Sequence, residues 1–293
     1  MSPCRLDPMR LATIVEANRT LLAYVRDDRY LPIDPSVDEP SAGSVRALAH
    51  GGPHAIDRAR AWAASRPAGE WRPLADVRFG PAIRDPGAIF TIGLNYIERG
   101  ETDVVGSGRP LVYGKLPSSV VGHGAVVTWD RALTDNVDAE VELGVVIGPG
   151  VDRAIDPDEA TAHVFGYTIV NDVSSRDPWL DGDQWLLGKS MPGFCPVGPW
   201  IVTADELDPM NIRLGCTLNG APIQDSQTSN MRRSIPEIVS YLSRHVALRA
   251  GDLIATGTPP RLASAPGPDR HLEPGDVVAC WIEGIGELTN TIA

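Results

Sequence analysis

The sequence lacks the patterns that define several large classes of protein. Its four cysteines (Cys4, Cys195, Cys216 and Cys280) form no CxxC pair, and its six histidines show no HxH or HExxH spacing, so a zinc site is not expected. No apolar run approaches the ~18 residues of a membrane-spanning helix, and the N-terminus lacks the apolar stretch of a signal peptide. These absences predict a cytoplasmic protein without a membrane partner, whose thiols are free and buried.

Basic residues are also scarce relative to acidic ones. The 293 residues include 26 Lys and Arg against 38 Asp and Glu, which gives a net charge of −12. Nucleic-acid binding needs a basic surface and is therefore not expected. A few local Lys and Arg side chains can still form a basic pocket, so an anionic small-molecule substrate is compatible with this composition.

The residues that are abundant favour a mostly β protein with a few helices, of the α+β class. The 29 Gly and 26 Pro residues predict many turns and short strands. The length suffices for two domains. We expect a small N-terminal α/β domain over residues 1–85 and a larger domain over 86–293. Strands are predicted over 11–15, 21–25, 88–92 and 111–113, and helices over 57–65, 157–164 (capped by Asp156) and 235–248 (capped by Ser234).

Three carboxylates follow short apolar segments. Glu140 and Glu142 are spaced i, i+2, which places both side chains on one face of a strand. Val141 and Leu143 alternate with them, which predicts a half-buried strand with an acidic face at its start. Asp172 follows a second apolar run. Such carboxylates repel one another unless a cation lies between them, which suits Mg²⁺, Mn²⁺ or Ca²⁺; a solvated acidic edge strand is the alternative.

Short motifs follow one another in a set order along the second part of the chain. They are Gly93-Leu-Asn-Tyr96, Tyr113-Gly-Lys115, Asp138-Ala-Glu140-Val-Glu142, Asn171-Asp172-Val-Ser-Ser-Arg176-Asp177, Gly188-Lys189-Ser190, Leu218-Asn219-Gly220 and Thr256-Gly257-Thr258-Pro259. No single motif is specific, but the whole series resembles the fumarylacetoacetate hydrolase family over about residues 88–293.

The resemblance implies a fold, a cofactor and a class of substrate. The implied fold is a mixed β-sandwich or β-roll with its site at the mouth, preceded by a small N-terminal domain and usually assembled as a homodimer. The implied cofactor is Mg²⁺ or Mn²⁺, held by Glu140, Glu142 and Asp172. Family enzymes act on compounds with a 1,3-dicarbonyl or 2-oxo acid unit, in which a divalent cation spreads the charge of an enolate.

Two residues are expected to have catalytic roles, Lys189 because of the resemblance and Thr258 because of the turn in which it lies. Lys189 aligns with the family's active-site lysine, whose ammonium group can stabilise negative charge or deliver a proton if its pKa is lowered. Thr258 lies in a Gly-Thr-Pro turn, where hydroxyl and backbone N–H groups can meet an oxyanion. The alternative for Lys189 is a surface lysine without a catalytic role. The alternative for Thr258 is a residue that only stabilises the turn.

Four further residues are expected to contact the substrate. Tyr113 and Lys115 follow a strand and are expected to line the pocket, unless they belong to a solvated loop. Arg176 is expected either to pair with Asp177 or to reach a substrate carboxylate. Trp179 stands where the family usually has a glutamine, and would make the pocket more apolar.

Two other departures from the family pattern lie in the substrate region. Many members have a His and a Glu after Gly-Leu-Asn-Tyr, and this pair activates water as a general base. Here those positions hold Arg99 and Thr102; Glu101 could substitute if the loop shifts register, and is otherwise an exposed glutamate. The Gly-Val-Gly-like turn that normally follows Thr-Gly-Thr-Pro is replaced by residues 260–264.

Three functions are compatible with these residues. The first is a metal-dependent C–C bond hydrolase or lyase that acts on a 2-oxo acid or 1,3-dicarbonyl compound through a metal-stabilised enolate. The second is a non-hydrolytic isomerase, tautomerase, decarboxylase or cyclase, because the usual water-activating pair is missing. The third is a catalytically silent member, against which the four residues Glu140, Glu142, Asp172 and Lys189 argue.

Overall fold

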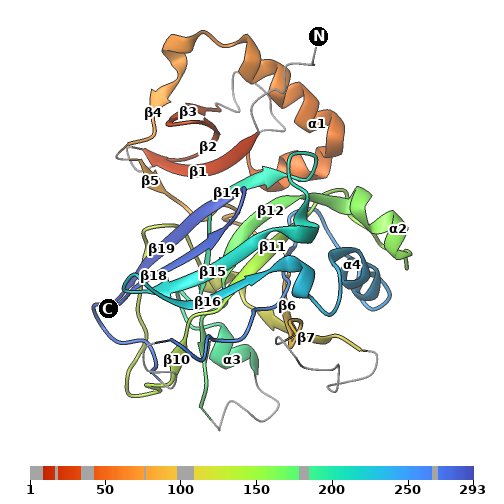
Figure 1. The fold of residues 1–293 in the computed structure, drawn as a ribbon. Coiled ribbons are helices and arrows are strands. Elements are labelled where there is room, and N and C mark those ends of the chain that lie inside the picture. Colours follow the sequence, from red (N-terminus) through yellow and green to blue (C-terminus); the bar gives the residue numbers. More distant parts are fainter. Residues whose placement is uncertain are drawn as a thin grey trace.

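The structure of the protein is a computed structural model that describes residues 9–16, 19–33, 43–75, 77–97, 109–177, 185–265 and 270–293 (Figure 1). Its helices are α1 (Val45–Ser65), α2 (Pro157–Ala160), α3 (Trp185–Lys189) and α4 (Ile235–Ser243). Its strands are β1 (Arg10–Glu16), β2 (Arg19–Arg26), β3 (Arg29–Pro32), β4 (Arg72–Pro73), β5 (Arg78–Phe79), β6 (Ile89–Gly93), β7 (Leu111–Lys115), β8 (Val120–Val121), β9 (Val126–Val127), β10 (Val137–Asp138), β11 (Val141–Ile147), β12 (Val164–Asn171), β13 (Ser174–Ser175), β14 (Cys195–Thr203), β15 (Arg213–Leu218), β16 (Ala221–Gln227), β17 (Leu253–Ala255), β18 (Val277–Ile282) and β19 (Gly286–Ile292).

Two large sheets form the body of the molecule. Within the described ranges, the larger sheet has 12 strands and runs in the order β4-β3-β2-β1-β14-β12-β11-β17-β6-β7, with β5 and β8 paired beside it. The second sheet has five strands in the order β16-β15-β18-β19-β9. Residues of β11, β12, β15 and β18 share one hydrophobic core, so the two sheets pack against each other. The predicted mostly β fold with a few helices is confirmed.

Strand β11, which carries Glu142, is a central strand. It pairs with β12 on one side and β17 on the other, and all seven of its residues are buried. The prediction of a half-buried strand is therefore wrong, as is the alternative of a solvated edge. The physical reason is that hydrophobic cores cover both faces of the sheet here, so Val145 and Val146 both pack inward although they point in opposite directions.

The helices begin largely where the sequence predicts. Ser234 caps α4 in a full capping box with Glu237, which satisfies two otherwise free N–H groups at the helix start. Asp156 precedes α2, but its side chain makes no capping hydrogen bond and pairs with Arg244 instead. Helix α1 contains the predicted 57–65 helix and extends back to residue 45, with a break at Gly52, where φ is 61°.

The N-terminal segment continues the larger sheet. Strand β1 pairs with β14 through Arg10↔Val202 and Leu11↔Ile201, and α1 packs on the same hydrophobic core as β14. The division of the chain into domains at residue 85 stays a prediction. The linker predicted over 71–81 contains the short strands β4 and β5, which pair with β3 and β1.

The predictions about the cysteines and about membrane-spanning segments can be compared with the structure. Cys195, Cys216 and Cys280 are free and buried, as predicted, and Cys4 lies outside the described residues. Among the helices described, none combines the length and the apolar character that crossing a bilayer requires.

Candidate metal centre and active-site cavity

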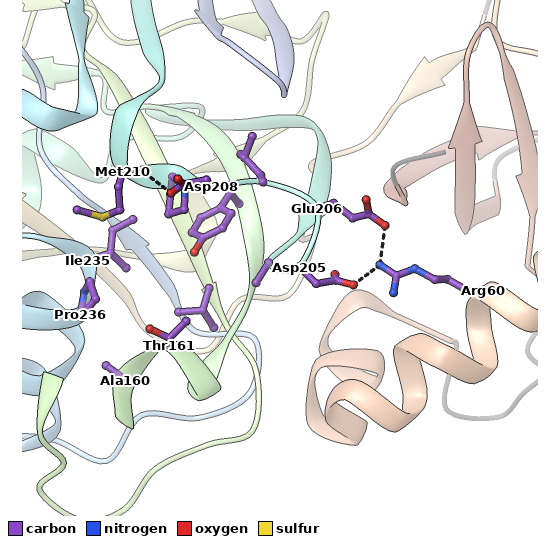
Figure 2. A pocket seen from close by; sticks show the side chains of 14 residues that line it. Arg60, Ala160, Thr161, Asp205, Glu206, Asp208, Met210, Ile235 and Pro236 are labelled. Carbon is purple, nitrogen blue, oxygen red and sulfur yellow. Dashed lines mark hydrogen bonds and ion pairs between the residues drawn. The ribbon is translucent and has the colours of Figure 1, made fainter. Parts of the chain in front are cut away.

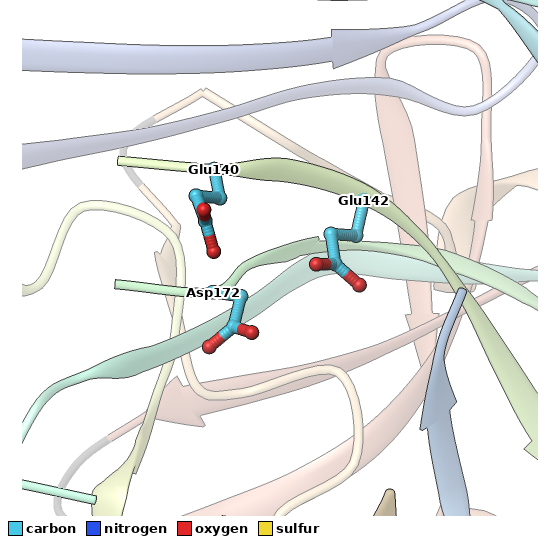
Figure 3. A group of neighbouring side chains, drawn as sticks. All are labelled: Glu140, Glu142 and Asp172. Atoms are coloured by element: carbon cyan, nitrogen blue, oxygen red, sulfur yellow. The ribbon is translucent and has the colours of Figure 1, made fainter. Parts of the chain in front are cut away.

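Three buried carboxylates meet where β11 and β12 lie side by side (Figure 3). Glu140 directly precedes β11, Glu142 lies within it, and Asp172 directly follows β12. One oxygen from each lies within 4.8 Å of the others. The Asp172 N–H donates to the Glu140 carbonyl (2.9 Å), and the Glu140 N–H donates to Asn171 Oδ1 (3.0 Å), so strand register brings the two ends together. Glu140 and Glu142 share one face, as their spacing predicts.

Two lysines, from helix α3 and strand β7, form ion pairs with Asp172. Lys189, in α3, donates to Asp172 Oδ2 (2.6 Å), to Ser174 Oγ (2.7 Å) and to Glu140 Oε2 (3.3 Å). Lys115, in β7, pairs with the other oxygen of Asp172 and is almost fully buried. Burial alone would lower the pKa of Lys189, but the Asp172 and Glu140 carboxylates raise it above its ordinary value. Lys189 is therefore a charged donor in this arrangement, and the alternative of a surface lysine is excluded.

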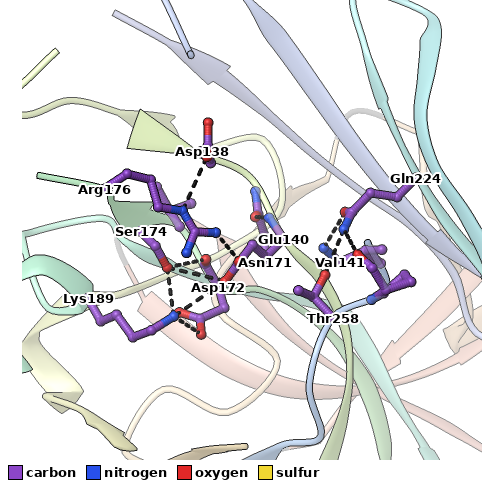
Figure 4. Close-up of polar contacts among 12 residues, drawn as sticks. Asp138, Glu140, Val141, Asn171, Asp172, Ser174, Arg176, Lys189, Gln224 and Thr258 are labelled. Atoms are coloured by element: carbon purple, nitrogen blue, oxygen red, sulfur yellow. Dashed lines mark hydrogen bonds and ion pairs between the residues drawn. The ribbon is translucent and has the colours of Figure 1, made fainter. Parts of the chain in front are cut away.

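Arg176 closes the cluster from the outer side (Figure 4). It pairs with Glu140 and donates to Asp138 Oδ2 (3.2 Å). Of the two expectations for Arg176, the pair with Asp177 is wrong, because Asp177 accepts from Ser175 Oγ (2.6 Å). Neighbouring side chains of an extended segment point to opposite sides, so Arg176 and Asp177 face different surroundings.

The charges in the cluster are unevenly balanced. Burial would raise the pKa of Asp172, but the Lys115 and Lys189 ammonium groups lower it to about 2. Burial together with the Asp172 and Glu140 carboxylates raises the pKa of Glu142 well above its usual range. Glu142 accepts one backbone N–H at 2.7 Å, and none of the described residues forms an ion pair with it. A divalent cation fits this set: its charge would balance Glu142, and carboxylate oxygens are ligands that Mg²⁺ and Mn²⁺ prefer.

The Thr258 hydroxyl is oriented by Gln224. The Gln224 carbonyl oxygen accepts from the Val141 N–H (2.9 Å), and its amide nitrogen donates to the Pro259 carbonyl (2.5 Å), so the direction of the amide is set by two backbone groups. The same nitrogen donates to Thr258 Oγ1 (2.8 Å). The Thr258 oxygen is thus an acceptor for Gln224, and its own hydrogen remains available to a group in the cavity.

A cavity of about 560 Å³ lies over the carboxylate cluster. Tyr113 and Trp185 line it, with ring centroids 5.2 Å apart, and Ile223 and Pro259 add apolar surface. Its polar lining includes Glu140, Glu142, Asp172, Arg176, Lys189, Gln224, Arg232, Thr258 and Arg261. Lys115 is not part of this lining, because its ammonium group lies behind Asp172.

Several residues of this cavity are absent from the sequence-based set. Trp185 and Gln224 line it, and no spacing or motif marks them, because α3 and β16 bring them there from distant parts of the sequence. Arg261 also lines the cavity, and it lies in the segment 260–264 that the sequence placed in the substrate region. A histidine also lies nearby: His271 Nδ1 is 2.9 Å from Asp138 Oδ1. The predicted base Glu101 and the predicted pocket residue Trp179 lie outside the described residues, as do Arg99 and Thr102.

A second cavity, of about 860 Å³, is larger but chemically different (Figure 2). Arg60 pairs there with both Asp205 (2.7 Å) and Glu206 (2.9 Å), while the exposed Asp208 accepts from the Met210 N–H (3.1 Å). Among the described residues, the acidic cluster with metal-ligand geometry is Glu140, Glu142 and Asp172, in the smaller cavity. We therefore place the candidate active site there.

The fold and this cluster together define a mostly β protein with a candidate divalent-cation centre of carboxylate oxygens. A sequence model of the family described as "Fumarylacetoacetate (FAA) hydrolase C-terminal" matches residues 88–293. An uncharacterized protein of Staphylococcus aureus (strain USA300) is 38% identical over 219 residues, which cover 74% of this chain and 73% of that protein. The chain belongs to the fumarylacetoacetate hydrolase family.

Solved structures agree with this assignment over nearly the whole chain. Fumarylacetoacetate hydrolase from Exiguobacterium antarcticum superposes with a TM-score of 0.84 at 32% identity, covering 97% of this chain and 99% of that one. A 5-carboxymethyl-2-hydroxymuconate delta-isomerase from Mycobacterium smegmatis has a TM-score of 0.76 at 30% identity, covering 97% and 98%. The chain is thus an enzyme of a family that includes both hydrolases and isomerases.

Proposed function

We propose that this protein is a divalent-metal-dependent hydrolase or lyase that acts on a 2-oxo acid or 1,3-dicarbonyl compound. The observation that carries the proposal is the cluster of Glu140, Glu142 and Asp172, buried beside a cavity and only partly balanced by nearby cations. These three residues would hold Mg²⁺ or Mn²⁺. A bound cation of this kind supplies positive charge to substrate oxygens while an enolate develops.

The protein's own side chains would do the remaining work around the substrate. Lys189 is a charged donor 2.6 Å from Asp172, so it can stabilise negative charge that develops next to the cluster. Thr258 has a hydroxyl hydrogen to donate to a substrate oxygen, because Gln224 occupies its acceptor side. The Tyr113–Trp185 wall suits an apolar substrate body and helps to exclude water.

A second candidate function is isomerisation, tautomerisation, decarboxylation or cyclisation on the same scaffold. Two observations favour it: Arg99 and Thr102 replace the His and Glu that activate water in many relatives, and one structural neighbour is an isomerase. Loss of a general base that activates water lowers the rate of hydrolysis by about 10²–10⁴-fold, while isomerisation, tautomerisation and decarboxylation need no activated water molecule. If the protein is a hydrolase, Glu101 remains the residue that we propose as the substitute general base.

The test combines metal binding with product analysis. Thermal unfolding is measured in chelator and with Mg²⁺ or Mn²⁺; a cation at 100 times its Kd stabilises by about 2.7 kcal/mol, and Glu142→Gln should abolish this shift. The same protein is then given 2,4-dioxo acids, which contain both substrate units, and NMR identifies the products. Cleavage into two organic fragments supports the hydrolase or lyase, whereas an isomer, a cyclised product or loss of CO₂ supports the alternative. If millimolar Mg²⁺ and Mn²⁺ leave the melting temperature of the wild-type protein unchanged, the proposal is refuted.

Two accompanying proposals concern the oligomeric state and the cellular location of the enzyme. We infer from the family that the protein is a homodimer, which light scattering on the purified chain would test. We also infer a cytoplasmic location, consistent with the free thiols Cys195, Cys216 and Cys280.

A further inference from the structure

Tyr167 is a buried tyrosine whose hydroxyl group faces the larger cavity without a partner. It lies in β12 and lines that cavity, and only 3% of its surface is exposed. None of the described residues forms a hydrogen bond with its hydroxyl group. The hydroxyl groups of Tyr24 and Tyr96 are also unpaired but are shielded from solvent, whereas that of Tyr167 is not shielded. A molecule that enters the larger cavity can therefore reach it.

Asp208 adds a negative charge to the lining of the same cavity. Its Oδ1 accepts from the Met210 N–H (3.1 Å), and none of the described residues forms an ion pair with it. Figure 2 shows Asp208 beside Met210 and apart from Arg60, whose guanidinium group is already paired with two other carboxylates. This side of the cavity therefore has a carboxylate but no cation among the described residues.

Tyr167 and Asp208 are close enough to influence each other electrostatically. Burial together with the Asp208 carboxylate raises the pKa of Tyr167 to about 12. The phenol therefore stays neutral near neutral pH, and its oxygen can accept a hydrogen bond. A carboxylate and a phenol oxygen together suit a ligand that donates more than one hydrogen bond and carries a positive charge. An ammonium group meets both conditions, because it has several N–H donors and one charge.

Apolar side chains surround these two polar groups and favour an organic ligand. Val164 and Ile235 are buried, and Leu207 and Met210 extend the apolar surface of the cavity. The volume of about 860 Å³ lies in the range of small-molecule sites. A metal ion is not favoured, because among the described residues the carboxylates that converge closely enough to share one are those of the smaller cavity. The larger cavity therefore suits a cation with an apolar body.

We propose that the larger cavity binds a small organic ammonium ion, whose charged group contacts Asp208 and Tyr167. Its apolar body packs on Val164, Met210 and Ile235. The bound ammonium group balances the charge of Asp208 and gives the Tyr167 hydroxyl the hydrogen-bond partner that it lacks. The site is separate from the candidate active site, so this inference does not depend on the proposed function.

Matched pairs of an amine and an alcohol test this inference. The probes are hexylammonium with 1-hexanol and 2-phenylethylammonium with 2-phenylethanol, so that the two members of a pair differ mainly in charge. Each is titrated at neutral pH, constant ionic strength and millimolar Mg²⁺ into the full chain, which carries ¹³C in its methionine methyl groups. The NMR shift of the Met210 methyl group gives the Kd, and Met210→Leu identifies that signal. We expect each ammonium ion to bind about 10-fold more tightly than its alcohol.

A second methionine shows where the probes bind. Met231 forms a backbone bridge with Tyr96, which lines the smaller cavity. Its methyl signal should stay unchanged while that of Met210 moves. This internal control separates binding in the larger cavity from binding to the carboxylates of the smaller one.

Three variants separate this site from the general negative charge of the protein. Asp208→Asn keeps an acceptor for the Met210 N–H but removes the charge, so the preference for the ammonium ion should fall to about one. Tyr167→Phe keeps the aromatic ring in β12 and should weaken the binding of the ammonium ion by about 3- to 10-fold. Asp225→Asn removes an exposed carboxylate that pairs with Arg213 outside the cavity, and it should keep the wild-type preference.

Three results would overturn the inference. The first is a Met210 signal that neither ammonium ion shifts, and the second is an alcohol that binds as tightly as its amine. The third is a preference for the ammonium ion that survives in Asp208→Asn. None of these results affects the proposed function, which is tested separately with 2-oxo acids and with Glu142→Gln.

Discussion

The two cavities of this protein differ in how their charges are balanced, and that difference indicates function better than size does. In the larger cavity Arg60 pairs with Asp205 and Glu206, and the remaining carboxylate, Asp208, is exposed to solvent. In the smaller cavity Glu142 is buried, and none of the described residues forms an ion pair with it. A buried carboxylate without a paired cation lowers stability, so Glu142 points to a bound cation.

The largest expected difference between the cavities comes from removing one carboxylate from each. Glu142→Gln should lower turnover on the order of 1000-fold, because a bound cation contributes several kcal/mol of charge stabilisation. Glu206→Gln, in the larger cavity, should leave turnover within about twofold. Steady-state kinetics with saturating Mg²⁺ measures both. Similar losses in the two variants would remove the distinction between the cavities.

The next largest effect should follow from removing one cation from each cavity. Lys115→Met leaves the buried Asp172 with one partner fewer, which should cost about 3 kcal/mol of unfolding free energy or more when a chelator is present. Arg60→Met breaks partly exposed pairs and should cost about 1 kcal/mol. Urea unfolding of both variants tests the order. A larger loss for Arg60→Met would contradict it.

A smaller effect is expected from removing one hydroxyl from each cavity. Thr258→Val deletes the donor that Gln224 orients, and should lower kcat by about 10- to 100-fold with little change in KM. Thr161→Val alters the wall of the larger cavity and should change neither constant. If Thr258→Val raises KM and leaves kcat unchanged, the hydroxyl binds the substrate without assisting the reaction.

The smallest effect concerns a half-buried titratable group outside both cavities. Partial burial lowers the pKa of His123, whose Nδ1 accepts from the Thr289 N–H (3.1 Å). The unfolded chain binds a proton at this histidine below about pH 6.5, whereas the folded chain binds it only at lower pH, so stability should fall as pH drops through that range. His123→Asn should reduce this fall, measured by urea unfolding at pH 5.5 and 7.5. An unchanged pH dependence would show that His123 does not contribute.

Much of the site could be predicted from the sequence because its residues lie close together in strands. The i, i+2 spacing of Glu140 and Glu142 places them on one face whatever the rest of the fold does. Asp172 was predicted from a second apolar run, and its place beside Glu140 follows from the pairing of β11 with β12. Ser234 was predicted as the cap of α4 for the same reason, because helix caps depend on local sequence, and the structure adds Glu237 as the second member of a capping box.

Other features could not be predicted, because they depend on which segments meet in space. Alternation suggested a half-buried strand around Val141, but β11 is covered on both faces. A pair with Asp177 was one of the two expectations for Arg176, but the fold brings Glu140 and Asp138 to it instead.

Local spacing was therefore enough to identify the carboxylate face, since side-chain direction along a strand is set by covalent geometry. The pairing of the buried charges could not be predicted from local spacing, because it depends on contacts between residues that are distant in the sequence. Lys115, 57 positions from Asp172 in the chain, pairs with that carboxylate, whereas none of the described residues forms an ion pair with Glu142. The packed fold creates that imbalance, because it brings some charges together and shields others from both water and partners.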